Sequence, residues 1–190
     1  MKAEEFVRLV NENIAKDRQK LAEEGLSEES INSLAYFTKK LPEEKRNDIT
    51  IPDQPELTKL LREYDISNTL SAGLDLWIIP DDMKEEDWYP KDMPYPQIGS
   101  DEEERNIMVV LPSGEIAFVS SNDGSVVELL AKDGDALMNV LVFISSILMD
   151  KGAKKITRKD MEKMVELAGG KKYESYYYDF YAHSDEYDGE

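Results

Sequence analysis

Three short β-forming runs joined by two tight turns constrain this chain more than any other feature. The runs cover residues 106–111, 115–120 and 125–130, and the turns are Pro112–Gly114 and Asn122–Gly124. Glycine, proline and asparagine are typical of turns because they supply or tolerate the backbone angles that turns require. Connections this short join antiparallel neighbours, because a parallel pair needs a long crossover. The sequence therefore predicts an antiparallel meander.

The most apolar segment follows the meander at once. It runs from Ala136 to Met149 and has three polar interruptions in fourteen residues. A helix that crosses a bilayer needs about 20 apolar residues, so we expect a buried helix that covers one face of the sheet. A further short strand is predicted at Leu74–Ile79, where Pro80 ends it.

Helical spacing of apolar residues predicts four more helices, over residues 3–24, 27–41, 55–64 and 157–168. Ser27 and Thr157 are the expected N-caps of the second and the last, and Asp160 stands where a capping box requires a side-chain acceptor. Residues 43–53 are polar and indicate a connection. The tyrosine-rich stretch 173–181 fits either an added strand or a docked aromatic segment.

These elements together predict an α+β fold, with an antiparallel sheet of about four or more strands covered by helices and preceded by a helical extension. The 190 residues fit one domain of ordinary size. We expect an N-terminal helical extension over 1–50, an α+β core over 51–152, and a C-terminal helix with an acidic, tyrosine-rich tail over 153–190.

The charge is strongly negative and unevenly distributed. The net charge is −18, of which residues 81–105 carry −7 and residues 173–190 carry −6. Such a chain repels phosphate backbones and anionic lipid, which argues against direct nucleic-acid binding and against adhesion to a membrane. No apolar signal segment begins the sequence, and the cytosol is the expected compartment.

The acidic segment 81–105 has two interpretations that the sequence leaves open. It can be a docking surface for a basic protein, because focused charge accelerates encounter, or a solvated loop. For the tail the solvated interpretation is favoured. Aromatic residues accompany the first segment, as in many binding hot spots. The candidate partner-binding residues are Asp81, Asp82, Glu85, Glu86, Asp87, Trp88, Asp92, Asp101, Glu102, Glu103 and Glu104.

Catalysis has little support in the sequence. The chain has no cysteine and a single histidine, His183, which excludes thiolate zinc sites and cysteine nucleophiles. The carboxylates occur as runs of neighbours, and neither Gly124 nor Gly134 has acidic residues at the spacing of a calcium-binding loop. We therefore expect no enzymatic activity, no cofactor and no metal. The oligomeric state is not predicted.

The order of motifs resembles the SUKH superfamily. Ile98–Asp101 follows a proline-containing aromatic loop and leads into the meander, and the apolar helix closes it; upstream, Pro55–Asp65 is similar to an early helix of the family and Leu74–Ile79 to its first strand. SUKH members include immunity proteins of bacterial polymorphic toxin systems and a yeast regulator of cell-wall synthesis. The resemblance implies an α+β domain that binds another protein and has no catalytic residues. Glu102–Glu104 stand where family members usually have glycines, which favours an acidic contact surface.

The function expected from this resemblance is that of an immunity protein. Such a protein binds a cognate toxin domain and occludes it, and a basic, nuclease-like cleft would suit an acidic surface. The alternative is a SUKH-like scaffold or regulatory adaptor that uses the same surface on a partner other than a toxin.

Overall fold

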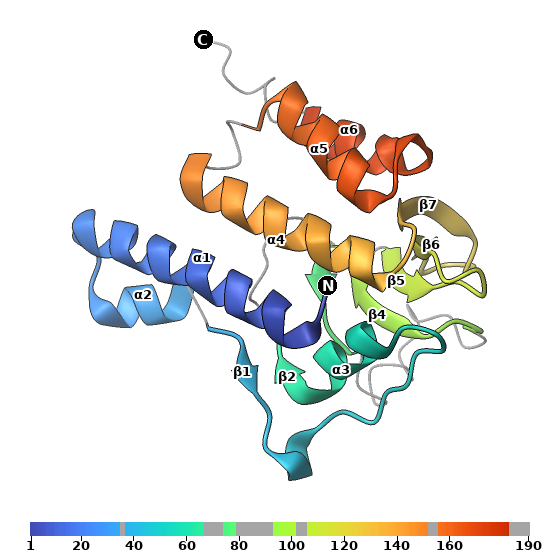
Figure 1. Ribbon diagram of the computed structural model, residues 1–190, viewed down its shortest axis with the longest axis horizontal. Helices are drawn as coiled ribbons and strands as arrows, with labels where there is room; N and C mark the ends of the chain where they lie inside the picture. The colour runs from blue at the N-terminus through green and yellow to red at the C-terminus, as the bar shows by residue number, and fades with distance from the viewer. Residues whose placement is uncertain (35–36, 67–73, 79–92, 102–105, 152–155, 183–190) are drawn as a thin grey trace.

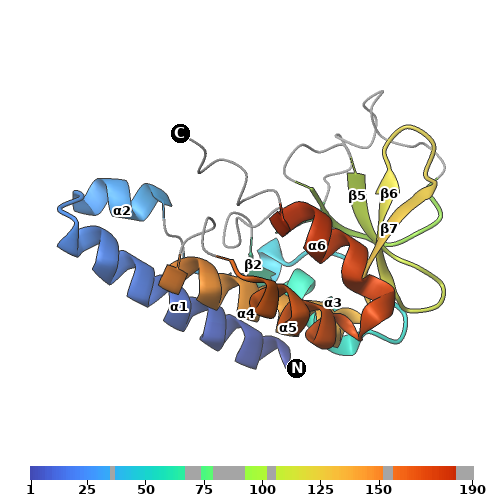
Figure 2. The ribbon, with the colours of Figure 1, turned by 90° about the horizontal axis from the view of Figure 1, so that it is seen from above.

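The computed structural model describes residues 1–34, 37–66, 74–78, 93–101, 106–151 and 156–182. The fold is α+β, as the sequence predicts: helices pack on one face of an antiparallel sheet, and a long helix begins the chain (Figures 1 and 2). In Figure 2 the long helices lie on one side and the strands β5, β6 and β7 on the other.

The main sheet has five strands in sequential order, which confirms the meander. Its strands are β3 (Asp75–Leu76), β4 (Gln97–Ser100), β5 (Asn106–Val110), β6 (Ile116–Ser120) and β7 (Val126–Ala131). All neighbours are antiparallel. Strand β4 was not predicted, because Gly99 and Ser100 interrupt its apolar pattern. It lies between β3 and β5 and joins the early strand to the meander.

Strands β5 and β6 are buried on both faces of the sheet. On one face Met108, Val110 and Phe118 belong to the main core beneath the helices. On the other face, residues Ile107, Val109 and Val119 form a second, smaller cluster and are fully buried. Strands covered on both faces read as continuous apolar runs, which explains why the pattern predicted these strands correctly.

Helix α4 (Gly134–Lys151) is the centre of the helical layer. It packs between α1 (Ala3–Glu23) and α5 (Arg158–Ala168), and Figure 1 shows the three helices side by side. Its apolar side chains are buried at nearly every turn, as expected for a helix with neighbours all round. Asn13 and Ser145 are both buried and form a hydrogen bond between α1 and α4 at 3.4 Å.

The helix predicted over 27–41 is shorter in the structure. Helix α2 (Glu28–Leu34) begins at the expected cap, where Ser27 Oγ accepts the Ser30 amide at 3.2 Å. Past the helix, β1 (Lys39–Lys40) pairs with β2 (Tyr64–Asp65), and the Leu41 amide donates to Glu63. The prediction of a helix through Leu41 was wrong because this long-range pairing outweighs the local apolar spacing.

The third predicted helix is confirmed, although it ends one residue early. Helix α3 (Pro55–Glu63) has proline in its first turn, which needs no amide donor there. Tyr64, expected on its apolar stripe, is buried in β2 instead. The connection between β1 and α3 is irregular, as expected, apart from the short helix η1 (Glu43–Lys45).

The C-terminal segment is helical and docks on the sheet. Helix α5 begins with the predicted capping box of Thr157 and Asp160. The tyrosine-rich stretch forms η4 (Lys171–Tyr173) and α6 (Glu174–Ala182), so the docked segment is confirmed and the added strand was wrong. The Tyr177 hydroxyl donates to the Leu130 carbonyl of β7 at 2.8 Å.

One hydrophobic cluster contains buried residues from all three predicted segments of the chain, including Phe6, Leu141 and Tyr177. The division at residues 50 and 152 therefore stays a prediction about chain organisation. Within the described ranges, none of the helices combines the length and the apolar character that a membrane span requires.

The buried hydroxyl of Tyr177 gives a direct test of how α6 is held. Tyr177→Phe leaves the Leu130 carbonyl without its donor in a buried site, and we expect the free energy of unfolding to fall by about 1–2 kcal/mol. Tyr178→Phe is the matched control, because this neighbouring, half-buried side chain makes no hydrogen bond within the described structure. Urea denaturation measures both variants. An equal loss of unfolding free energy in the two variants would contradict the role assigned to the Tyr177 hydroxyl.

The Glu115 carboxylate accepts hydrogen bonds from two residues of the C-terminal segment. The contribution of these bonds to stability should therefore depend on pH. Hydrogen bonds from Lys172 and then from Tyr173 lower the pKa of Glu115. Burial raises the pKa of Tyr173, so its phenol remains a donor. Because the folded pKa of Glu115 is depressed, its stabilisation is present above the unfolded value of about 4.3 and is lost as the pH falls through the folded pKa.

Glu115→Gln should therefore lower the free energy of unfolding by about 1 kcal/mol at neutral pH, since Lys172 is largely exposed. The difference from the wild type should shrink toward about pH 3. Denaturation curves at both pH values measure this, with Glu29→Gln, an exposed carboxylate of α2, as the control. A difference that does not change with pH would contradict the account.

Candidate functional site

The pairing of β3 with β4 defines where the first acidic stretch attaches. Asp75 faces Ser100 and Leu76 faces Gly99, and the Trp77 amide continues the ladder by donating to the Ile98 carbonyl at 3.1 Å. The chain returns to the sheet at Gln97. Residues 77–96 thus connect two neighbouring antiparallel strands, and we call them the first acidic connection.

The second acidic stretch, residues 101–105, joins β4 to β5 and is called the second acidic connection. At its start the Asp101 amide donates to the Asn106 carbonyl at 3.1 Å. The Asn106 side-chain amide donates in return to the Asp101 carboxylate at 2.7 Å. These two hydrogen bonds fix the orientation of the Asp101 carboxylate at the edge of the sheet.

The two connections attach at opposite ends of β4. A strand of four residues extends about 10 Å, so the acidic residues that are continuous in sequence attach to the sheet at two separated points. Of the eleven candidate partner-binding residues, Asp101 is described, and it is half-buried. The others lie outside the described residues and stay predictions: Asp81, Asp82, Glu85, Glu86, Asp87, Trp88, Asp92, Glu102, Glu103 and Glu104.

The ends of the first acidic connection are held on the sheet face that the helices leave free. Trp77, Met93 and Tyr95 pack against the second cluster of buried strand residues. The indole Nε1 of Trp77 also donates to Ser100 Oγ, which is buried, at 2.9 Å. Both ends of this acidic connection are therefore fixed by apolar packing, and one of them also by a hydrogen bond.

A surface cavity of about 330 Å³ lies beside the point where the first acidic connection leaves the sheet. It separates β2 from the residues that follow β3. Its apolar wall is formed by Leu41, Leu61, Tyr64, Ile66, Trp77 and Ile78. Its polar residues are Lys45, Asn47 and Asp65. We call it the first cavity.

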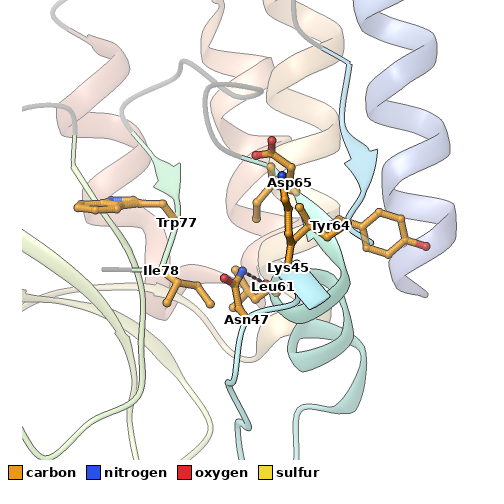
Figure 3. Close-up of a pocket in the computed structure, with 9 residues that line it drawn as sticks. Lys45, Asn47, Leu61, Tyr64, Asp65, Trp77 and Ile78 are labelled. Atoms are coloured by element: carbon orange, nitrogen blue, oxygen red, sulfur yellow. Dashed lines mark hydrogen bonds between the residues drawn. The ribbon is translucent and has the colours of Figure 1, made fainter. Parts of the chain in front are cut away.

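Figure 3 shows how different parts of the chain meet around the first cavity. Trp77 and Ile78 lie on one side, and Tyr64 and Asp65 lie across from them. Asn47 donates through its side chain to the Leu61 carbonyl at 2.8 Å, which holds the connection after β1 against α3. A mostly apolar cavity with a few polar side chains at its rim is suited to receiving an apolar side chain of another molecule.

The described residues of the first cavity offer apolar side chains and a few polar groups. Across the described ranges, His, Cys, Asp and Glu side chains form no group of three or more that is placed to hold a metal ion. His183 lies outside those ranges.

Sequence reasoning found the acidic connections but missed the first cavity. Its residues come from three separate segments, 41–47, 61–66 and 77–78, and none of them shows a local pattern of a binding site. Trp77 and Ile78 lie within the strand predicted at Leu74–Ile79, but that pattern does not indicate a cavity. In the structure Trp77 is half-buried, and its indole contributes to both the second cluster and the cavity.

Comparisons with known proteins do not assign the chain to a family. Searches of family models, of curated proteins and of solved structures gave no significant match. The SUKH resemblance thus rests on the order of motifs alone.

The bond between Trp77 and Ser100 can be tested by a double-mutant cycle. Trp77→Phe and Ser100→Ala each remove one partner of a hydrogen bond that joins the ends of β3 and β4. We expect a coupling energy of about 0.5–1.5 kcal/mol between the two substitutions, measured by urea denaturation. Additive losses would show that the bond does not hold this end of the acidic connection.

Proposed function

We propose that this protein is a non-catalytic protein-binding domain of the SUKH type, an immunity protein that binds a cognate bacterial toxin domain in the cytosol and occludes its active site. The observation that carries the proposal is the concentration of charge. Residues 81–105 and 173–190 hold −13 of the net charge of −18. A partner that complements this charge is basic, and a nuclease domain with a cleft for nucleic acid has that character.

The anchoring of the acidic connections supports a binding role. Trp77, Met93 and Tyr95 pack on the sheet at the two ends of the first connection, and Asp101 is bonded to Asn106 at the start of the second. Ends that are already ordered reduce the entropy that is lost when such a surface binds a partner. Charge that is attached at fixed positions on the sheet is suited to bringing a basic partner to the protein in a consistent orientation.

The first cavity adds a short-range component to this long-range attraction. Charge accelerates encounter, whereas lasting complexes depend on a few buried, mostly aromatic or apolar contacts. The first cavity lies directly beside the start of the first acidic connection. A partner guided by the acidic residues could therefore place an apolar side chain there.

The order of elements supports the SUKH assignment within this proposal. An early helix, a strand, a proline-containing aromatic loop, a meander and a closing apolar helix follow one another as the resemblance implies. We assign residues 173–190 a smaller part in partner binding than residues 81–105. Tyr173, Tyr176, Tyr177 and Tyr181 are buried against the core, so most of the tail's aromatic residues have a structural use.

The proposal is tested by affinity capture from a lysate of the source organism at about 50 mM and about 500 mM salt, with mass spectrometry. The variant Asp81→Asn, Asp82→Asn, Glu85→Gln, Glu86→Gln removes four carboxylates of the first acidic connection. We expect one basic protein to be retained by the wild type at low salt, to be lost at high salt, and to be reduced at least about tenfold in the variant. Purified partner should be toxic to cells, and co-expression of the wild type should prevent this.

The matched control removes four exposed carboxylates at the far end of α1 and the start of α2. Its substitutions are Glu23→Gln, Glu24→Gln, Glu28→Gln and Glu29→Gln. Equal loss of the partner in both variants would show that only the net charge matters and would contradict the assigned surface. A captured partner without toxicity would favour the scaffold or adaptor alternative.

A further inference from the structure

A second cavity, of about 470 Å³, lies where the first acidic connection returns to the sheet. Four separate turns contribute to it: residues 52–54, 94–96, 110–114 and 132–133. Nothing in the proposed function above uses this cavity. It shares its wall with the acidic connection, since Pro94, Tyr95 and Pro96 belong to both.

The second cavity is held in shape by Gln54. The side-chain amide of Gln54 donates to the Gly114 carbonyl at 3.0 Å, and its oxygen accepts the Gly134 amide at 2.9 Å. Gln54 is buried, and its two bonds tie the turn before α3 to the turn after β5 and to the start of α4. The walls are thus fixed before any ligand arrives.

Prolines form much of the lining and make it rigid. Four of the eight prolines of the chain line the cavity, beside Tyr95, and proline has no amide N–H. Two nearby amides are already used: Val110 donates to the Pro96 carbonyl at 2.9 Å, and Gly114 to the Leu111 carbonyl at 2.8 Å. These two amides are therefore not available to a ligand.

Two carboxylates supply the acceptors. Asp133 uses Oδ1 to accept the Ala136 amide at 2.7 Å, which leaves its second oxygen for a ligand. The Asp53 side chain is exposed and has no partner within the described part of the chain. Lys132 is the one cation of the lining, and its stem lies against Gly169 at the end of α5.

We propose that the second cavity receives an arginine side chain. Its three-carbon stem packs on the prolines, its planar guanidinium stacks on the ring of Tyr95, and its N–H groups donate to Asp53 and Asp133. That the arginine belongs to a basic partner protein rests on the proposed function. The preference of the cavity for a guanidinium group does not depend on it.

The test uses the isolated full-length protein and acetyl-arginine amide as the probe. Titration is followed by ¹⁵N–¹H NMR at the amide of Gly114, which lines the cavity, and at the amide of Gly134, which donates to the lining residue Gln54. We expect saturable shifts at these amides. The citrulline analogue has the same shape without the charge and should bind at least about fivefold more weakly, which corresponds to about 1 kcal/mol.

Three variants separate this arrangement from nonspecific attraction. Asp53 has a left-handed backbone with φ 58°, which asparagine tolerates, and asparagine also serves as an N-cap in place of Asp133. Asp53→Asn and Asp133→Asn should therefore fold normally and weaken arginine binding about two- to fivefold each. Lys132→Gln removes a like charge and should strengthen it. Equal binding of citrulline, or equal effects of all three variants, would overturn the proposal.

This experiment and the capture experiment fail independently. The NMR titration needs no partner, so it can succeed even where no toxin is found. If acetyl-arginine amide causes no shifts but capture of the partner still depends on charge, the arginine site is overturned and the proposed function is not.

Discussion

Burial of both faces of β5 and β6 is the constraint on which the rest of the structure depends. Helices cover one face, and fully burying each apolar side chain of Ile107, Val109 and Val119 on the other stabilises the fold by roughly 1.5–3 kcal/mol. The residues that pack over this second cluster are Trp77, Met93 and Tyr95, which lie at or beside the two ends of the first acidic connection. The same packing that completes the core therefore determines where the most acidic part of the chain leaves the sheet and where it returns.

This arrangement explains how so acidic a chain keeps a compact core. Its net negative charge is concentrated in residues 81–105 and 173–190, whereas α4 and the central strands carry few acidic residues. The two cavities flank the ends of the first acidic connection: the first includes Trp77 and Ile78, and the second includes Pro94, Tyr95 and Pro96. We therefore propose that the charge of the first acidic connection attracts a partner and that the two cavities beside its ends hold the partner's side chains.

The parts of the fold that were predicted correctly are those that local chemistry determines. Turns of two or three residues impose antiparallel neighbours, and the capping box of Thr157 and Asp160 begins α5 where it was expected. The errors lie where distant segments decide. Lys39–Lys40 has no strand pattern and pairs with Tyr64–Asp65 only in the folded chain. For the tyrosine run the sequence left a strand and a docked segment open, and tertiary contacts decide: Tyr176 packs on Phe118 and Tyr177 bonds to Leu130. Neither cavity was predictable, since each joins residues from separate segments of the chain. The acidic residues proposed for binding stay predictions apart from the position of Asp101.

The central claim is that charge at the ends of a rigid sheet brings a basic partner to this protein. Its most direct test is the association rate constant with the purified partner, measured by stopped flow as a function of ionic strength. The account predicts that the rate constant falls at least about tenfold between about 20 mM and about 500 mM salt while the dissociation rate constant changes little. An association rate that does not depend on salt would contradict it.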